Sequence, residues 1–168
     1  MTLLSKVVNI DDNKTEMVFA EFRGIKSLRR QVKKLKIVFV DHSELAHSGV
    51  PKTTVARKQN GKFVQLRHKD TEYLVFSSRE FASYHADIVE RFCREKDIPG
   101  VYNASGKRFV IHDPAWVIVG GGKFEIDKTE KYILVYDNSM AYGRFESKGL
   151  KDKISAIKEL KDYEVRIG

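Results

Sequence analysis

The spacing of apolar residues predicts a chain built mainly from β-strands. Residues 35–40 (LKIVFV) form an apolar run rich in β-branched side chains, and residues 62–68 and 72–76 read as two strands joined by a tight turn. The same criteria predict further strands at residues 16–22, 108–112, 115–119, 123–126, 131–136 and 163–167. Three consecutive glycines at residues 120–122 are expected to end one of these strands.

Helical spacing occurs in three segments. The strongest is residues 77–100, which carries an apolar stripe with charged residues around the rest of the helix. The stripe consists of Ile88, Val89, Phe92 and Cys93. Ser78 and Ser83 compete as its N-cap, and the Pro-Gly pair at its far end is expected to terminate it. Weaker helical patterns lie at residues 25–34 and 151–160.

Together these elements predict an α+β fold with a mixed β-sheet and two to three flanking helices. Strands outnumber helices, and the two do not alternate regularly as they would in a doubly wound protein. A chain of 168 residues fits one compact unit. Within it we expect residues 1–58 to form a basic N-terminal extension, packed on or inserted ahead of a core domain at residues 59–168.

Composition narrows the setting of the protein. No run approaches the roughly 18 apolar residues of a membrane-spanning helix, and the first residues lack the apolar stretch of a signal peptide. We therefore expect a cytoplasmic protein without a membrane partner. The single cysteine, Cys93, excludes an internal disulfide framework and a cysteine-rich metal site.

The net charge of +8 is concentrated near the N-terminus. Residues 1–60 contain 12 Lys and Arg against 6 Asp and Glu, whereas residues 61–168 contain 19 against 17. The basic cluster consists of Lys26, Arg29, Arg30, Lys33, Lys34 and Lys36. A patch of this kind can attract RNA or an acidic protein, but no aromatic residues are interleaved as a stacking platform, so a solvated helix face is the simpler interpretation.

Three short motifs could carry chemistry. Residues 84–88 (YHADI) place His85 near the start of the long helix, where free backbone N–H groups and the helix dipole favour an anion and an uncharged imidazole. Residues 137–143 (DNSMAYG) follow a strand and contain small residues that let backbone amides approach a ligand. Residues 120–123 (GGGK) lack the spacing of a P-loop and are better explained as a bulge or turn. Taken singly, a structural histidine and an ordinary loop are the simpler interpretations of the first two.

The order of these motifs, followed by a C-terminal DYEV strand, closely resembles the Janus/Ocnus family, which includes the eukaryotic phosphohistidine phosphatase. The resemblance covers about residues 62–166. It implies a phosphatase that needs no metal or cofactor and acts on histidine- or lysine-phosphorylated proteins. The chain differs from the family in its long N-terminal extension and in a longer segment between residues 101 and 116.

The resemblance also assigns the site residues. His85 matches the catalytic histidine, and the backbone amides that hold phosphate match His85, Ala86, Ser139 and Ala141. Tyr84 and Met140 would line the site. The family's phosphate-binding lysine on an early strand best matches Lys62, with Lys36 as the rival.

The residues are compatible with this chemistry, but they decide neither the role of His85 nor between an enzyme and a binding protein. Phosphoryl transfer needs mainly positioning and charge stabilisation, which backbone amides and a lysine supply. His85 could activate a water as a general base or attack phosphorus as a nucleophile. The alternative function is a non-catalytic protein on the same fold that binds phosphate or RNA. His42 and His47 share a polar loop, for which a metal site is less favoured than an ordinary exposed loop.

Overall fold

The computed structural model describes residues 36–42 and 57–168, which belong to a compact unit that begins at Leu35. Its elements in chain order are β1 (Lys36–Asp41), β2 (Lys58–His68), β3 (Thr71–Ser78), α2 (His85–Glu95), β4 (Gly100–Tyr102), β5 (Phe109–Ile111), β6 (Trp116–Asp127), β7 (Tyr132–Tyr136), α3 (Leu150–Ser155) and β8 (Glu164–Ile167). The strand and helix expected at residues 16–22 and 25–34, and His47, lie outside the described residues.

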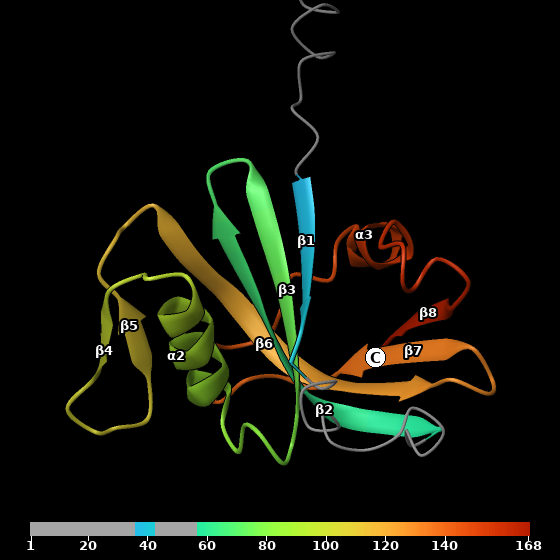
Figure 1. Cartoon of the computed structure of the whole chain (residues 1–168), viewed down its shortest axis with the longest axis horizontal. Coiled ribbons are helices and arrows are strands. Elements are labelled where there is room, and N and C mark those ends of the chain that lie inside the picture. Colours follow the sequence, from blue (N-terminus) through green and yellow to red (C-terminus); the bar gives the residue numbers. More distant parts are fainter. Residues whose placement is uncertain (1–35, 43–56) are drawn as a thin grey trace, which may run out of the picture. The chain divides into compact units, whose positions relative to one another are not determined.

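The main sheet has six strands in the order β1-β3-β2-β6-β7-β8 (Figure 1). The pairs β1–β3 and β7–β8 are parallel, and the pairs β2–β3, β2–β6 and β6–β7 are antiparallel. A mixed sheet with two described helices confirms the predicted α+β class. The boundary between residues 58 and 59 stays a prediction, and β1, which precedes it, is an edge strand of this sheet.

Each face of the sheet is covered by one helix (Figure 1). Because successive side chains of a strand point to opposite faces, Val64 and Leu66 of β2 pack with α2, whereas Phe63 packs with α3. We call these the α2 face and the α3 face. The separate β4–β5 hairpin packs beside α2, and its first strand was not anticipated from the sequence.

The glycine run does not end a strand, as was expected, because β6 continues through residues 120–122. Here β6 is paired with β2, and the pairing supplies the hydrogen bonds that hold glycines extended. The register shifts between Gln65 and Leu66, opposite Gly120 and Ile118, so the glycines lie next to a bulge.

The long helix begins later than either predicted serine. Its N-cap is Tyr84, whose backbone N–H donates to the carboxylate of Asp87 at 2.8 Å. Ser78 is instead the last residue of β3, and Ser83 precedes the cap. Both predictions were wrong because an acidic residue at the third helical position can cap the backbone N–H of Tyr84 without help from a serine.

Both helices also end earlier than predicted. After α2, Asp97 adopts a left-handed conformation (φ 54°), and the N–H of Ile98 donates to the carbonyl of Cys93 at 2.8 Å. This arrangement closes a helix before the Pro-Gly pair is reached. The second predicted helix, residues 151–160, is helical only to Ser155, and the following turns place Ile157 and Leu160 in the core of the α3 face.

Candidate active site

The imidazole of His85 lies against Gly121 and Gly122 of β6. His85 is the first residue of α2, and its Nε2 is 2.9 Å from the carbonyl oxygen of Gly122. A Cβ atom added at Gly121 would come within 2.9 Å of Cδ2 of His85. A side chain at this position would therefore displace the imidazole, and glycine allows the ring to rest on the strand.

This contact fixes which nitrogen of His85 is available for chemistry. A carbonyl oxygen only accepts hydrogen bonds, so Nε2 carries the hydrogen and, in the neutral ring, Nδ1 holds the lone pair. The Cδ2–Nε2 edge of the ring faces Gly121 and Gly122, so Nδ1 is on the opposite edge. Within the described part of the chain, Nδ1 has no hydrogen-bond partner.

The surroundings of His85 keep the imidazole uncharged. Only 8% of the residue is exposed, and this burial is the main reason that its pKa lies below the ordinary 6.5. The ammonium groups of Lys62 and Lys123 lower the pKa further, while the bond to Gly122 and the carboxylate of Asp137 oppose them. The imidazole of His85 is therefore neutral, as expected from the sequence. The main cause is its burial and not the helix dipole.

The first turn of α2 presents free backbone donors beside the imidazole. Tyr84 N–H is bonded to Asp87, and Asp87 N–H donates to the carbonyl of Tyr84 at 3.2 Å. The N–H groups of His85 and Ala86 make no hydrogen bond to any described residue. These two amides are unpaired as expected at a helix N-terminus, and the Tyr84 side chain is exposed next to them.

The turn at residues 139–143 lies against the same glycine as His85. Ser139 and Gly143 exchange backbone hydrogen bonds of 3.1 and 2.8 Å, and the carbonyl of Gly143 also accepts from Gly121 N–H at 3.1 Å. The amide of Ser139 is thus engaged inside the turn, whereas those of Met140 and Ala141 have no partner among the described residues. The two motifs, 54 residues apart from His85 to Ser139, therefore meet at Gly121.

The structure separates the two candidate lysines. Lys62 pairs with Ser77 in β3, and its ammonium donates to the carbonyl of Ser83, just before α2. Burial and the nearby Arg79 lower the pKa of Lys62. Lys36 pairs with Thr71, six residues away along β3, which corresponds to about 20 Å. Lys62 therefore lies at the site and Lys36 does not.

Two charged residues at the site were missed by sequence reasoning. Lys123 lies directly opposite Lys62 in the β2–β6 register, and its Nζ is 2.7 Å from Oδ2 of Asp137. Both residues act electrostatically on His85. The motifs GGGK and DNSMAYG contain them, but only the strand register shows that Lys123 and Lys62 share a face.

Comparison with known proteins identifies the family of the chain. Residues 47–164 match the family model described as Janus/Ocnus family (Ocnus). The chain belongs to the Janus/Ocnus family. This family includes phosphohistidine phosphatases. A search of curated proteins gave no match.

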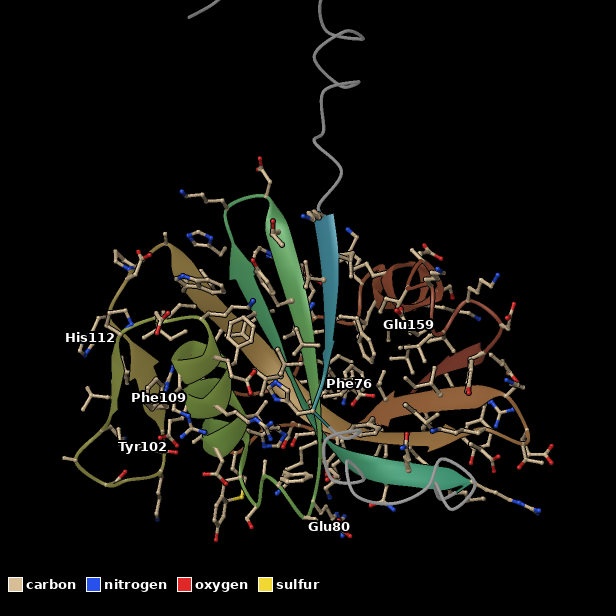
Figure 2. The ribbon with its side chains drawn as sticks, viewed as in Figure 1. Phe76, Glu80, Tyr102, Phe109, His112 and Glu159 are labelled. Atoms are coloured by element: carbon tan, nitrogen blue, oxygen red, sulfur yellow. The ribbon has the colours of Figure 1, made fainter. Side chains whose placement is uncertain are left out.

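In this Janus/Ocnus protein, the β4–β5 hairpin contacts both turns of the site through Tyr102 and Phe109, the two hairpin residues that Figure 2 labels. The hydroxyl of Tyr142 accepts from Phe109 N–H and donates to Phe109 O, each at 2.9 Å. The hydroxyl of Tyr102 donates to Glu90 at 3.2 Å and to Asp87 at 3.4 Å. The hairpin thereby connects the turn at residues 139–143 to the first turn of α2.

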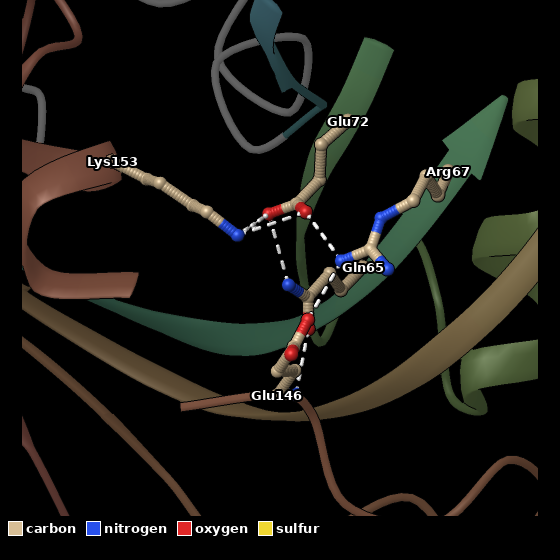
Figure 3. A network of polar contacts seen from close by, with 5 residues as sticks. All are labelled: Gln65, Arg67, Glu72, Glu146 and Lys153. Atoms are coloured by element: carbon tan, nitrogen blue, oxygen red, sulfur yellow. Dashed lines mark hydrogen bonds and ion pairs between the residues drawn. The ribbon is translucent and has the colours of Figure 1, made fainter. Parts of the chain in front are cut away.

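A buried polar network holds the segment that follows the turn (Figure 3). Glu72 is fully buried and accepts hydrogen bonds from Gln65, Arg67 and Lys153, each at 2.9 Å. Burial alone would raise the pKa of Glu72, but these donors lower it below the ordinary value. The side-chain oxygen of Gln65 also accepts a hydrogen bond from Glu146 N–H at 2.8 Å. The network therefore connects β2, β3 and α3 to the segment that follows the turn at residues 139–143.

A separate cavity of about 440 Å³ lies away from the site, between β1 and the C-terminal segment. It is lined by Phe39, Asp41, Gln59, Ile126, Lys128, Glu159, Leu160 and Tyr163, none of which is a site residue. Among the described residues, there is no cluster of three or more His, Cys, Asp or Glu side chains suited to a metal ion. None of the described helices combines the length and apolarity that crossing a membrane requires.

Proposed function

We propose that this protein is a metal-independent phosphatase that hydrolyses the P–N bond of phosphohistidine or phospholysine in proteins, with His85 as the catalytic residue. The observation that carries the proposal is that the imidazole of His85 and the turn at residues 139–143 both lie against Gly121. Unpaired amides occur in both turns, and the cross-strand pair of Lys62 and Lys123 lies two residues farther along β6 on the same face. Membership of a family that includes phosphohistidine phosphatases supports it.

The amides and Lys62 would bind the phosphoryl group. The free N–H groups of His85 and Ala86 form one side of the cradle, and those of Met140 and Ala141 form the other, with Ser139 supporting the second turn. Backbone donors that are fixed before the reaction stabilise charge on phosphoryl oxygens without reorganisation. The exposed side chains of Tyr84 and Met140 would line the entrance.

Both mechanisms considered for His85 begin with a lone pair on Nδ1. As a general base, Nδ1 takes a proton from water while the water oxygen bonds to phosphorus and the P–N bond breaks. As a nucleophile, Nδ1 bonds to phosphorus, the P–N bond of the substrate breaks, and water then hydrolyses phosphorylated His85. In each route the bonding electrons leave with the substrate nitrogen, which departs most readily when it is protonated.

The decisive experiment compares turnover by the wild-type protein and His85→Ala, with phosphoramidate as substrate and a chelator present. We expect chelator-resistant turnover in the wild type and a loss of at least about 10²–10⁴-fold in the variant, the usual range for a positioned acid–base group. His112→Ala is the matched control, because His112 is exposed near the end of the β4–β5 hairpin (Figure 2). Its turnover should equal that of the wild type.

The same experiment tests the alternative function. If the wild type and His85→Ala show the same background rate, the protein is not this enzyme, and a phosphate-binding or RNA-binding role on the same fold remains. If chelator abolishes turnover by the wild type, the metal-independent mechanism is wrong.

A further inference from the structure

A carboxylate lies at the edge of the cluster of positive charge. Asp137 directly follows β7 in a left-handed conformation (φ 67°). Its Oδ1 accepts the N–H of Asn138 at 2.8 Å, and its Oδ2 is 2.7 Å from Nζ of Lys123. The local turn therefore fixes the carboxylate in the orientation that reaches Lys123.

The position of Lys123 makes this ion pair relevant to an anion in the site. Lys123 is the direct cross-strand neighbour of Lys62, and side chains opposite each other on one face lie about 5 Å apart at Cβ. Lys123 and Asp137 both influence the pKa of His85, in opposite directions. A phosphoryl group beside His85 would therefore experience attraction from two lysines and repulsion from one carboxylate.

The ion pair is of a kind that can exchange partners. The side chains of Lys123 and Asp137 are 34% and 40% exposed, and pairs at this exposure are stabilised only weakly because water solvates both partners. Lys123 can leave Asp137 for a phosphoryl oxygen at little cost. The carboxylate then stays nearby as an unneutralised negative charge.

We propose that Asp137 is a specificity-determining residue, which competes with phosphoryl oxygens for Lys123 and thereby disfavours free phosphate more than substrate. This inference rests on the proposed function. Repulsion by a carboxylate grows with the net charge of the ligand. Just above neutral pH inorganic phosphate is mostly a dianion, whereas a phosphoramidate with a protonated leaving nitrogen carries about one negative charge less. Asp137 would thus favour release of the product over release of the substrate.

The test measures binding of inorganic phosphate to the full chain by titration calorimetry, with wild type, Asp137→Asn and Glu164→Gln. Asparagine tolerates a left-handed conformation and keeps the oxygen that accepts Asn138 N–H, so this variant removes mainly the charge. We expect Asp137→Asn to bind phosphate about three- to tenfold more tightly, and KM for a phosphoramidate to fall less than twofold. Glu164→Gln removes one exposed carboxylate of β8, which pairs with Arg166, and should bind like the wild type.

A second substitution tests whether Asp137 weakens phosphate binding through Lys123. In a Lys123→Met background, Asp137→Asn should no longer tighten phosphate binding, because the contested ammonium is gone. Unchanged or weaker phosphate binding in Asp137→Asn, the absence of phosphate binding in both proteins, or equal tightening in the Lys123→Met background would each overturn the proposal. Because binding is measured without turnover, this result can stand even if His85→Ala shows that the protein is not a phosphatase.

Discussion

At the scale of single residues, the protonation state of His85 controls the proposed chemistry. Burial lowers its pKa below 6.5, with Lys62 as a further cause, so the ring is neutral at pH 7. We expect kcat/KM for phosphoramidate to fall as the pH drops through the pKa of His85, because protonation removes the lone pair of Nδ1. NMR titration of the wild type should locate this pKa below 6.5 and at the acidic limb of the rate profile.

The matched lysine variants test the cause of that shift. Lys62→Met should raise the pKa of His85 and weaken substrate binding, because it removes a nearby positive charge that opposes protonation. Lys36→Met should change neither, since Lys36 pairs near the opposite end of β3. An equal effect of the two substitutions would contradict the assignment of Lys62 to the site, and a pKa of His85 above 6.5 in the wild type would contradict burial as the main cause of the shift.

The assignment of His85 and Lys62 to the site stays a prediction, but the structure shows where both residues lie. The ring of His85 lies against Gly121 and Gly122, and Lys62 pairs with Lys123, which directly follows the glycines. The Ser139 amide, expected to face phosphate, is bonded to Gly143 instead. The charge of Lys123 and Asp137 was overlooked because their relevance depends on strand register, which pairs residues far apart in the sequence.

At the scale of elements, local signals predicted the existence of strands and helices but not their ends. The glycine run looks like a break, yet pairing with β2 keeps β6 continuous and makes the glycines a surface for His85. The ends of α2 depend on Asp87 and on the left-handed Asp97, which are weaker signals than Ser83 or the Pro-Gly pair. Tertiary pairing overrides intrinsic propensity in the first case, and specific capping chemistry decides the second.

The β4–β5 hairpin should stabilise the turn at residues 139–143 through Tyr142. Burial raises the pKa of Tyr142 to about 12, so its hydroxyl remains a donor as well as an acceptor. Tyr142→Phe would leave both the N–H and the carbonyl of Phe109 without this partner. We expect a loss of about 1–3 kcal/mol in the free energy of unfolding, measured with urea, and a rise in KM for phosphoramidate.

Tyr102→Phe is the control for this prediction. The hydroxyl of Tyr102 donates to carboxylates of Asp87 and Glu90 at longer distances, and carboxylates at the surface can bind water instead. Its cost should stay below about 1 kcal/mol, with little change in KM. A larger effect of Tyr102→Phe than of Tyr142→Phe would argue against the hydroxyl of Tyr142 as the main link between the hairpin and the turn.

At the scale of the whole molecule, one face of the sheet contains most of the aromatic core and the other carries the proposed site. The α3 face contains most of the large aromatic core residues, including Phe63, Phe76 and Phe124, together with the buried network around Glu72. The α2 face carries His85, Lys62 and Lys123. The sequence predicted the mixed sheet and its helices, but not the strand order, because the parallel pairs β1–β3 and β7–β8 join segments that are not adjacent in the chain.

Although a solvated helix face is the simpler interpretation of the basic cluster, we propose that the N-terminal extension has a regulatory or docking function toward an acidic protein or RNA. The net charge of the chain is concentrated in residues 1–60, and long-range attraction of this kind accelerates association with negatively charged molecules. The compact unit that carries the proposed site begins at Leu35. Deleting residues 1–34 should therefore separate a docking function from catalysis.

We expect the deletion variant to keep its fold and its kcat/KM for phosphoramidate, because the residues of the proposed site all belong to the unit that begins at Leu35. It should lose affinity for RNA or an acidic phosphorylated protein, and the difference from the full chain should shrink at high salt as charges are screened. Circular dichroism, turnover of both substrate sizes and binding at two salt concentrations test these points. If residues 1–34 can be removed without altering folding, partner affinity or substrate range, the extension has no docking role, because the deletion removes five of the six residues of the basic cluster.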